Sequence, residues 1–336
     1  MKRTISNIFY GAMLLLGTLA GVSCDEWTEN EKIGVSEPVF GEGNPEQYAR
    51  YLSSLRAYKS SDHQRMIVWF DNSDKHPASR GGFFADVPDS VDIVALTAEG
   101  RLTAEELEQV GTLREKGTKV IGAFNCENVL ARNDGTQKPE ELLASALAER
   151  MGQIEADGLD GITLCYEPTD PAFATEEELL AQQALDAVIT QALTGWREKH
   201  PEGLILFEGN PQYLSDRAAV TACDYLVVRC LDAESVYDFG IRARRMCAAE
   251  GIPSDRFLWL VSAVPPTATD DTGYLADASG VSVRAVGALA EWLLLPEDIG
   301  KAGVGIMDVQ YDYYNSAMIY YYTKEAIEVL NPSPKN

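Results

Sequence analysis

Residues 156–167 read Ala-Asp-Gly-Leu-Asp-Gly-Ile-Thr-Leu-Cys-Tyr-Glu, and the part from Gly161 to Tyr166 is an apolar run of strand length. Seven further short and largely apolar runs occur along the chain: Met66–Phe70, Val91–Leu96, Lys119–Phe124, Leu204–Phe207, Tyr225–Val228, Phe257–Val261 and Val304–Val309. Runs rich in β-branched and aromatic residues are typical of strands that are buried on both faces of a sheet. We therefore expect eight buried strands.

Helical stretches with recognisable ends separate these runs. Thr103 with Glu106, and Thr175 with Glu178, have the spacing of capping boxes, and Pro139 suits the first turn of a helix. Helices are expected from Asn44, from Thr103 to Gly117, and over 139–155, 175–199, 234–250, 282–294 and 315–330. Strands that alternate with helices predict an α/β fold, a (β/α)8 TIM barrel forming a single domain over residues 44–336. A doubly wound open sheet is disfavoured, because no Gly-x-Gly-x-x-Gly follows the first strand.

The composition excludes several classes of partner. The 336 residues include 28 Lys and Arg against 52 Asp and Glu, which gives a formal charge of −24. This charge repels phosphate backbones and anionic bilayers, so we expect no nucleic-acid partner and no membrane contact except through an anchor. Three histidines lie far apart and no Cys-x-x-Cys occurs, so no metal site and no cofactor are expected.

The amino terminus has the pattern of a targeting segment. Lys2 and Arg3 precede an apolar run from Ile8 to Val22 that is short for a spanning helix. The run leads into Gly21-Val22-Ser23-Cys24, which resembles a bacterial lipobox, and the acidic residues that follow resemble the surface-export signal of Bacteroidetes lipoproteins. We expect residues 1–23 to be a lipoprotein signal peptide, Cys24 to carry the lipid, and residues 24–43 to form a flexible tether.

The mature protein is therefore expected at the outer membrane, lipid-anchored and on the cell surface. The alternative is an ordinary secreted protein with a cysteine near its cleavage site. Five cysteines follow Cys24, and this odd number does not indicate a disulfide scaffold.

Polar and aromatic residues close or flank several of the apolar runs. In a barrel, binding and catalytic residues lie at the carboxyl ends of the strands, where these side chains would meet. The residues expected to bind a ligand there are Trp69, Asp71, Asn125, Tyr166, Glu208, Asn210, Arg229, Trp259, Asp308 and Tyr311. Any one of the polar residues alone is equally well explained as a cap or turn residue, but together around one rim they favour a polar site. Segments 71–90 and 263–281, rich in Pro, Gly, Ser and Asp, are expected to be binding loops.

The segment 156–167 resembles the signature of glycoside hydrolase family 18, Asp-Gly-x-Asp-Gly-x-Asp-x-Asp-x-Glu. Leu55–His63, together with Trp69-Phe70, resembles the Bacteroidetes branch that includes endo-β-N-acetylglucosaminidases. Members of the family use the acetamido oxygen of the sugar itself as the nucleophile. The resemblance places Glu167 at the position of the general acid. It places Cys165 where an Asp orients the acetamido group and stabilises the positively charged intermediate.

The sequence departs from the family pattern at this site. Thr163 and Cys165, which share a strand face with Glu167, replace two Asp residues, and a neutral thiol supplies no fixed negative charge. The sixth strand ends in Arg229-Cys230-Leu231 without the usual Gln and Tyr, and Ile121–Asn125 lacks the Ser-x-Gly-Gly of the third strand. Loss of one preorganised electrostatic group typically costs on the order of 10²–10³ in rate. We therefore expect a pseudo-glycosidase, inactive or weakly active, in which Glu167 is vestigial.

The resulting interpretation is a surface lipoprotein that binds N-acetylglucosamine-containing, N-glycan-like oligosaccharides beside neighbouring glycan-uptake proteins. The alternative is an active endo-β-N-acetylglucosaminidase that cleaves the chitobiose core of N-glycans, with the missing carboxylate supplied by Asp160, Glu208 or Asp308. A scaffold without a ligand is disfavoured, because it gives no reason for the polar rim.

Overall fold

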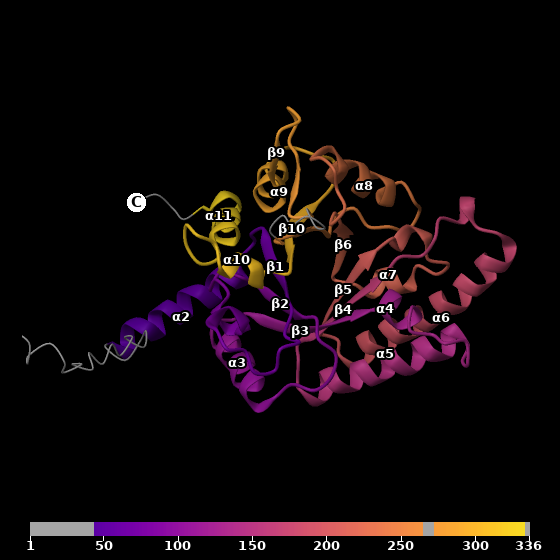
Figure 1. The fold of residues 1–336 in the computed structure, drawn as a ribbon, viewed down its shortest axis with the longest axis horizontal. Helices are drawn as coiled ribbons and strands as arrows, with labels where there is room; N and C mark the ends of the chain where they lie inside the picture. Colours follow the sequence, from indigo (N-terminus) through magenta and orange to yellow (C-terminus); the bar gives the residue numbers. More distant parts are fainter. Residues whose placement is uncertain (1–43, 265–271, 333–336) are drawn as a thin grey trace, which may run out of the picture. The chain divides into compact units, whose positions relative to one another are not determined.

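The computed structural model describes residues 44–264 and 272–332, and the chain from Arg50 onward forms one compact unit. Eight parallel strands close into a barrel in the order β1-β10-β7-β6-β5-β4-β3-β2 (Figure 1). They are β1 (Arg65–Phe70), β2 (Ile93–Leu96), β3 (Lys119–Asn125), β4 (Gly161–Tyr166), β5 (Leu204–Gly209), β6 (Tyr225–Arg229), β7 (Phe257–Ser262) and β10 (Lys301–Met307). The prediction of a single (β/α)8 TIM barrel is confirmed. The predicted signal peptide (residues 1–23), Cys24, the predicted tether (residues 24–43) and part of the predicted binding loop 263–281 lie outside the described residues.

Helices surround the strands, and α5 and α6 pack side by side along one flank of the barrel (Figure 1). The helices are α2 (Pro45–Ser60), α3 (Ala104–Glu115), α4 (Cys126–Leu130), α5 (Pro139–Ala156), α6 (Glu176–Lys199), α7 (Ala218–Ala222), α8 (Tyr237–Cys247), α9 (Ala285–Leu293), α10 (Gln310–Tyr313) and α11 (Tyr321–Leu330). Over the residues that the structure describes, no helix has both the length and the apolar character needed to cross a bilayer.

Two predicted helices differ from those observed. The start of the helix expected over 282–294 is strand β9 (Ser282–Arg284), which pairs with β8 (Tyr274–Ala276) in a hairpin that the sequence analysis missed. The helix expected over 315–330 begins only at Tyr321, because Tyr320 has a left-handed backbone with φ of 54°. The carboxylate of Asp312 then holds the start of α11 by accepting bonds from the backbone N–H and the hydroxyl of Thr323, both at 2.8 Å.

Both predicted capping boxes are present, at Thr103 with Glu106 and at Thr175 with Glu178. The first also positions the rim of the barrel, because Glu106 accepts a hydrogen bond from Asn72 at 2.7 Å. The same carboxylate forms an ion pair with Lys75 at 2.8 Å. The start of α3 therefore fastens the loop that follows β1.

The acidic residues before β4 have structural roles, one at the end of a helix and one at the entry of the strand. Asp157 lies at the end of α5 and accepts a hydrogen bond from the backbone N–H of Leu102 at 2.9 Å. Asp160 accepts a hydrogen bond from the backbone N–H of Val120 at 2.9 Å, just before β4 begins. Both therefore lie at the amino end of the strands, away from the carboxyl ends where Glu167 follows β4.

Gly209, at the end of β5, is required by both its backbone and its surroundings. Its φ is 120°, and a Cβ atom there would lie 2.1 Å from the carbonyl oxygen of Tyr166. We predict that Gly209→Ala lowers the free energy of unfolding by at least about 2 kcal/mol, through strain and overlap. In the control Gly195→Ala, within α6, a Cβ meets nothing within 4 Å. This change should stabilise the protein by about 0.5–1 kcal/mol in urea unfolding, and equal effects of the two variants would contradict the prediction.

Candidate functional site

The interior of the barrel is filled by apolar side chains and becomes polar at the carboxyl ends of the strands. A cluster of buried side chains fills the interior: Ile67, Trp69, Ile93, Ala95, Ile121, Leu206, Val227, Leu258 and Leu260. Above it, Cys165 of β4 is in register with Asn125 of β3 on one side and with Glu208 of β5 on the other. The alternation of strand side chains therefore brings polar groups from neighbouring strands to one level of the mouth.

Glu208 is the central carboxylate of this layer and is 2% exposed. Its Oε1 accepts hydrogen bonds from Trp69 Nε1 at 2.8 Å and from Thr163 Oγ1 at 2.7 Å. Its Oε2 accepts a hydrogen bond from Arg229 Nη1, also at 2.8 Å. Donors from three other strands thus satisfy a carboxylate that would otherwise be costly to bury.

Arg229 joins Glu208 to Glu167. Its Nε lies 2.9 Å from Oε1 of Glu167, whose side chain is 46% exposed. Burial by itself would lower the pKa of Arg229, but the negative charge of Glu208, assisted by Glu167, outweighs it and raises that pKa. A permanently charged guanidinium therefore lies between the two carboxylates.

Cys165 is a neutral thiol in this setting. It is 4% exposed, and burial, reinforced by the negative charge of Glu208, raises the pKa of the thiol. All five cysteines of the described chain are free. The structure therefore contains a neutral group at position 165, with the nearest buried carboxylate on the adjacent strand.

Two cavities open at this end of the barrel, and Arg229 lines both. The axial cavity, of about 560 Å³, is lined by Trp69, Asp71, Ser73, Lys75, Thr97, Ala98, Glu99, Ala123, Phe124, Asn125, Asn128, Arg132, Cys165, Glu208, Arg229, Met307 and Asp308. The side cavity, also of about 560 Å³, is lined by Glu167, Gly209, Asn210, Gln212, Arg229, Leu231, Asp232, Asp238, Ile241, Arg242, Arg245 and Met246. No group of three or more His, Cys, Asp or Glu that could hold a metal ion occurs in the part of the chain that the structure describes.

Most of the residues expected at the site line these cavities. Trp69, Asp71, Asn125, Cys165, Glu208, Arg229 and Asp308 line the axial cavity, whereas Glu167, Asn210 and again Arg229 line the side cavity. Thr163 lies deeper and reaches the site through its hydrogen bond to Glu208. Tyr311 lies on α10, 50% exposed, and is not part of either lining.

Two more of the expected binding residues, Tyr166 and Trp259, are buried away from both cavities. Tyr166 is 3% exposed on the outer face of β4 and donates a hydrogen bond to Asp186 of α6 at 2.9 Å. Trp259 is fully buried and donates to the carbonyl oxygen of Phe239 in α8, also at 2.9 Å. The expectation that these two residues bind a ligand is therefore corrected. Strand alternation is the reason, because Tyr166 is adjacent to the inward-facing Cys165 and must point outward.

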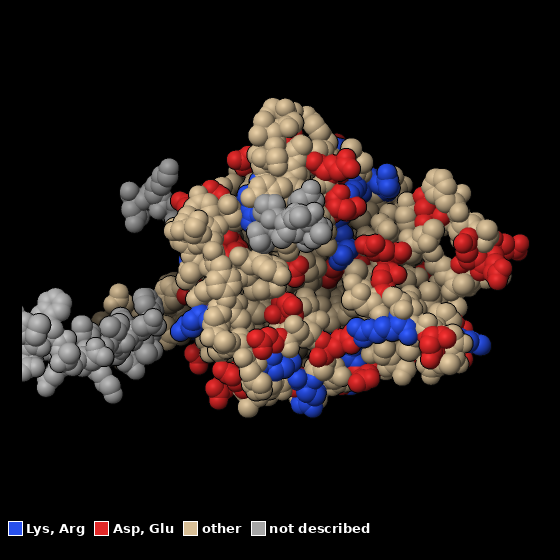
Figure 2. Space-filling model, in the orientation of Figure 1, with Lys and Arg blue, Asp and Glu red and all other residues tan. Residues whose placement is uncertain are grey.

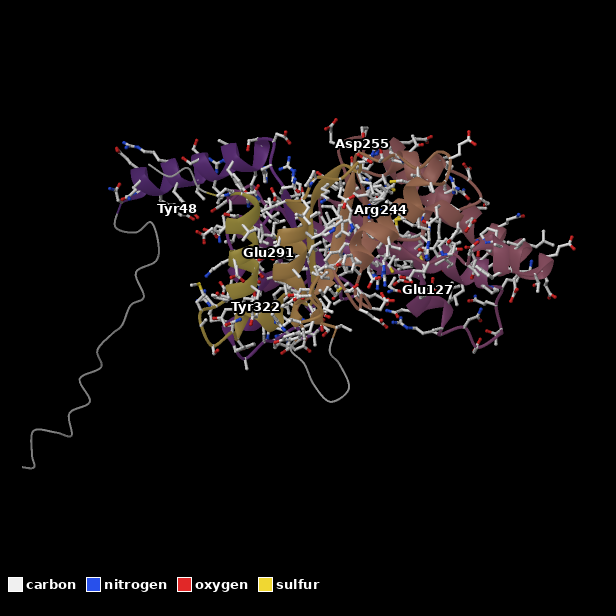
Figure 3. All side chains as sticks on the ribbon, turned by 90° about the horizontal axis from the view of Figure 1, so that it is seen from above. Tyr48, Glu127, Arg244, Asp255, Glu291 and Tyr322 are labelled. Carbon is white, nitrogen blue, oxygen red and sulfur yellow. The ribbon has the colours of Figure 1, made fainter. Side chains whose placement is uncertain are left out.

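The sequence analysis missed several residues on the cavity walls. Lys75 and Arg132 line the axial cavity, and Gln212, Arg242 and Arg245 line the side cavity. They belong to loops and helices that follow the strands, so no strand pattern singles them out. Glu127, on α4 and labelled in Figure 3, was also missed; it accepts a hydrogen bond from the backbone N–H of Glu167 at 3.2 Å.

The family model for glycoside hydrolase family 18, BT1044-like, matches residues 28–142 and 123–329. The chain belongs to glycoside hydrolase family 18. The family inferred from segment 156–167 is thus confirmed. A comparison with curated proteins found no match.

Comparison with solved structures agrees with this assignment at the level of the fold. A Glu-to-Gln variant of BT1044 shares 17% identity, with 88% of this chain and 97% of that chain covered and a TM-score of 0.61. The endo-β-N-acetylglucosaminidase of Cordyceps militaris shares 19% identity over 84% and 95%, with a TM-score of 0.60. Human YKL-39, described as a pseudo-chitinase with retained chitooligosaccharide binding, shares 9% identity over 79% and 98%, with a TM-score of 0.54.

The ion pairs of Arg229 give a matched stability test. Glu208→Gln leaves the partly buried guanidinium without its buried partner and should lower the free energy of unfolding by about 3 kcal/mol. Glu167→Gln removes a half-exposed partner of the same guanidinium and should cost about 1 kcal/mol or less. Urea unfolding of both variants at neutral pH measures the difference. Equal losses would show that Glu208 is not the main partner of Arg229.

Proposed function

We propose that this chain is a cell-surface lipoprotein that binds N-acetylglucosamine-containing glycans of N-glycan type and does not cleave them efficiently. The observation that carries the proposal is the neutral, buried thiol of Cys165 at the position where the family resemblance expects a carboxylate. Human YKL-39 supports it by analogy, since a protein with this fold is described as a pseudo-chitinase that retains chitooligosaccharide binding.

The charge at the site is unsuited to substrate-assisted cleavage. Attack by the acetamido oxygen produces a positively charged intermediate, which a fixed negative charge must stabilise. Cys165 supplies none, and the charge of Glu208 is already engaged by Arg229 at 2.8 Å. The guanidinium is itself a positive charge on the cavity wall, which disfavours a second cation there.

The contact between Glu167 and Arg229 also argues against efficient cleavage. A general acid must donate a proton to the departing oxygen. An arginine side chain carries only donors, so the Oε1 atom of Glu167 that faces Arg229 at 2.9 Å acts as an acceptor. The Oε1 atom is therefore occupied by Arg229 and is not free to face a departing oxygen.

Glycan binding does not need this charge arrangement. The axial cavity, of about 560 Å³, combines amide and carboxylate groups with the apolar surfaces of Trp69, Phe124 and Met307. Concave sites with apolar walls and a few directed polar groups are suited to small ligands such as sugars. The polar side chains at its mouth would then serve to hold hydroxyl and acetamido groups.

An active endo-β-N-acetylglucosaminidase is the second candidate, and Glu208 is the observation that favours it. This buried carboxylate is in register with Cys165 and lines the same cavity, so it offers a negative charge near the expected position. Asp308 also lines that cavity, whereas Asp160 is bonded at the opposite end of the barrel.

Release and binding assays separate these functions. Purified protein is incubated with an N-glycosylated protein, released glycan is quantified, and glycan affinity is measured by calorimetry for the parent and Glu167→Gln. We expect binding without efficient release, and little change in affinity in the variant. Release at ordinary enzyme rates that disappears in Glu167→Gln would establish the second candidate. Absence of both binding and release would leave a scaffold without a ligand as the remaining function.

Restoring a carboxylate tests the reason for low activity. Cys165→Asp places an anion at the position where the resemblance expects one, and should raise glycan release by about tenfold or more, part of the typical contribution of such a group. Cys165→Ser, a neutral change of similar size, should leave release at the parent level. Equal release by the parent and both variants would show that position 165 does not limit the reaction.

The proposed surface location depends on Cys24. Mass spectrometry of the membrane fraction should find Cys24 as the lipidated amino terminus of the mature chain. An unmodified, unanchored protein would contradict the lipoprotein part of the proposal and leave the binding part intact.

A further inference from the structure

The side cavity gathers arginines in a chain with a strong excess of acidic residues. Arg229, Arg242 and Arg245 all line it, although Lys and Arg number 28 in the whole chain against 52 Asp and Glu. Figure 2 shows basic side chains over α8, the helix that carries Arg242 and Arg245. With Glu167, Asp232 and Asp238 also on its wall, the cavity has as many basic as acidic side chains and lacks the acidic excess of the whole chain.

One of these arginines is available to a ligand. Arg229 is bound to Glu208 and Glu167, and Arg242 donates to Asp232 at 2.6 Å. Arg245 is exposed and forms no hydrogen bond or ion pair with any residue in the described ranges.

The acidic residues of the cavity wall already have donors. Glu167 and Asp232 are in the ion pairs with Arg229 and Arg242, and Asp238 accepts bonds from the backbone N–H groups of Glu234 and Ser235 at 2.9 and 3.0 Å. Among the described lining residues, Arg245 is therefore the positive charge that no direct ion pair neutralises, and Asp238, held by backbone N–H groups, is the negative charge without one.

Gln212 gives a second, independent indication of a ligand. It is 6% exposed on the cavity wall, and its Oε1 is buried without a hydrogen-bond partner among the described residues. Its Nε2 donates to Asn210 at 3.5 Å. A buried acceptor without a donor is unfavourable, and a ligand that brings an N–H or O–H group would satisfy it.

We propose that the side cavity binds an acidic sugar, one carrying a carboxylate or a sulfate, at the end of the glycan whose neutral part occupies the axial cavity. Arg245 binds the anion, since a guanidinium donates parallel hydrogen bonds to such groups. Gln212 accepts a hydrogen bond from an amide or hydroxyl of the same sugar, and Leu231, Ile241 and Met246 contact its C–H surface. Arg229 lines both cavities, so one oligosaccharide can extend from one to the other. This inference rests on the proposed glycan-binding function and adds the acidic character of the ligand.

Calorimetry with three oligosaccharides that share an N-acetylglucosamine core tests the proposal. One is neutral, one ends in N-acetylneuraminic acid, and one carries a sulfate. At least one acidic glycan should bind about tenfold more tightly than the neutral one at low salt, with a smaller advantage at high salt. The acidic glycan that binds more tightly shows whether the cavity prefers a carboxylate or a sulfate. Equal affinity for all three would overturn the acidic-sugar proposal alone, whereas no binding of any would overturn the proposed function with it.

Two arginines on α8 provide a matched comparison. Arg245→Gln should remove the preference for the acidic glycan, lowering affinity for the acidic glycan much more than affinity for the neutral one. Arg244→Gln should change neither, because Arg244 is paired with Glu297 at 2.8 Å and does not line the cavity. Equal effects of the two variants would overturn the assignment of Arg245.

Replacement of the buried acceptor gives a further readout. Gln212→Met keeps the volume of the side chain and removes the unpaired oxygen. Affinity for the acidic glycan should fall severalfold while stability to urea is unchanged or increased. Unchanged affinity in this variant would overturn the role of Gln212.

Discussion

A single guanidinium bonded to two carboxylates organises the mouth of this barrel. Arg229 reaches the buried Glu208 with Nη1 and the half-exposed Glu167 with Nε, and so connects the ends of β4, β5 and β6. A buried ion pair is stable only when its geometry is good and its remaining polar atoms are satisfied. Trp69 and Thr163 meet this condition by donating to the other oxygen of Glu208.

The same guanidinium lies on the walls of both cavities. It lines both the axial and the side cavity, and its charge influences whatever binds in either. A positive group in this position suits polar or anionic sugar substituents and disfavours a developing cation. The proposed binding without cleavage follows from this guanidinium, whereas the proposed preference for an acidic sugar depends on Arg245 and Gln212 on the wall of the side cavity.

The residues that the fold requires and the residues that catalysis requires are only partly the same. The barrel needs apolar residues on both faces of its strands, and it retains them throughout, from the interior cluster around Ile67 to the outer layer that contains Trp259. The mouth of the barrel does not need apolar residues on both faces, so its polar groups can change while the fold persists. Structural neighbours at 9–19% identity with TM-scores of 0.54–0.61 illustrate how much sequence change this fold tolerates.

The sequence by itself determined the eight strands, both capping boxes and the family, because burial on two faces and helix capping leave local patterns. It also placed Glu167, Cys165 and Glu208 at the ends of strands, since strand ends can be read from the chain. Only the tertiary structure decided that Arg229 bonds to two of them, that Tyr166 and Trp259 point outward, and that Arg245 and Gln212 share a cavity wall. These are contacts between segments far apart in the chain, and they depend on strand register and helix placement, which local sequence patterns do not encode.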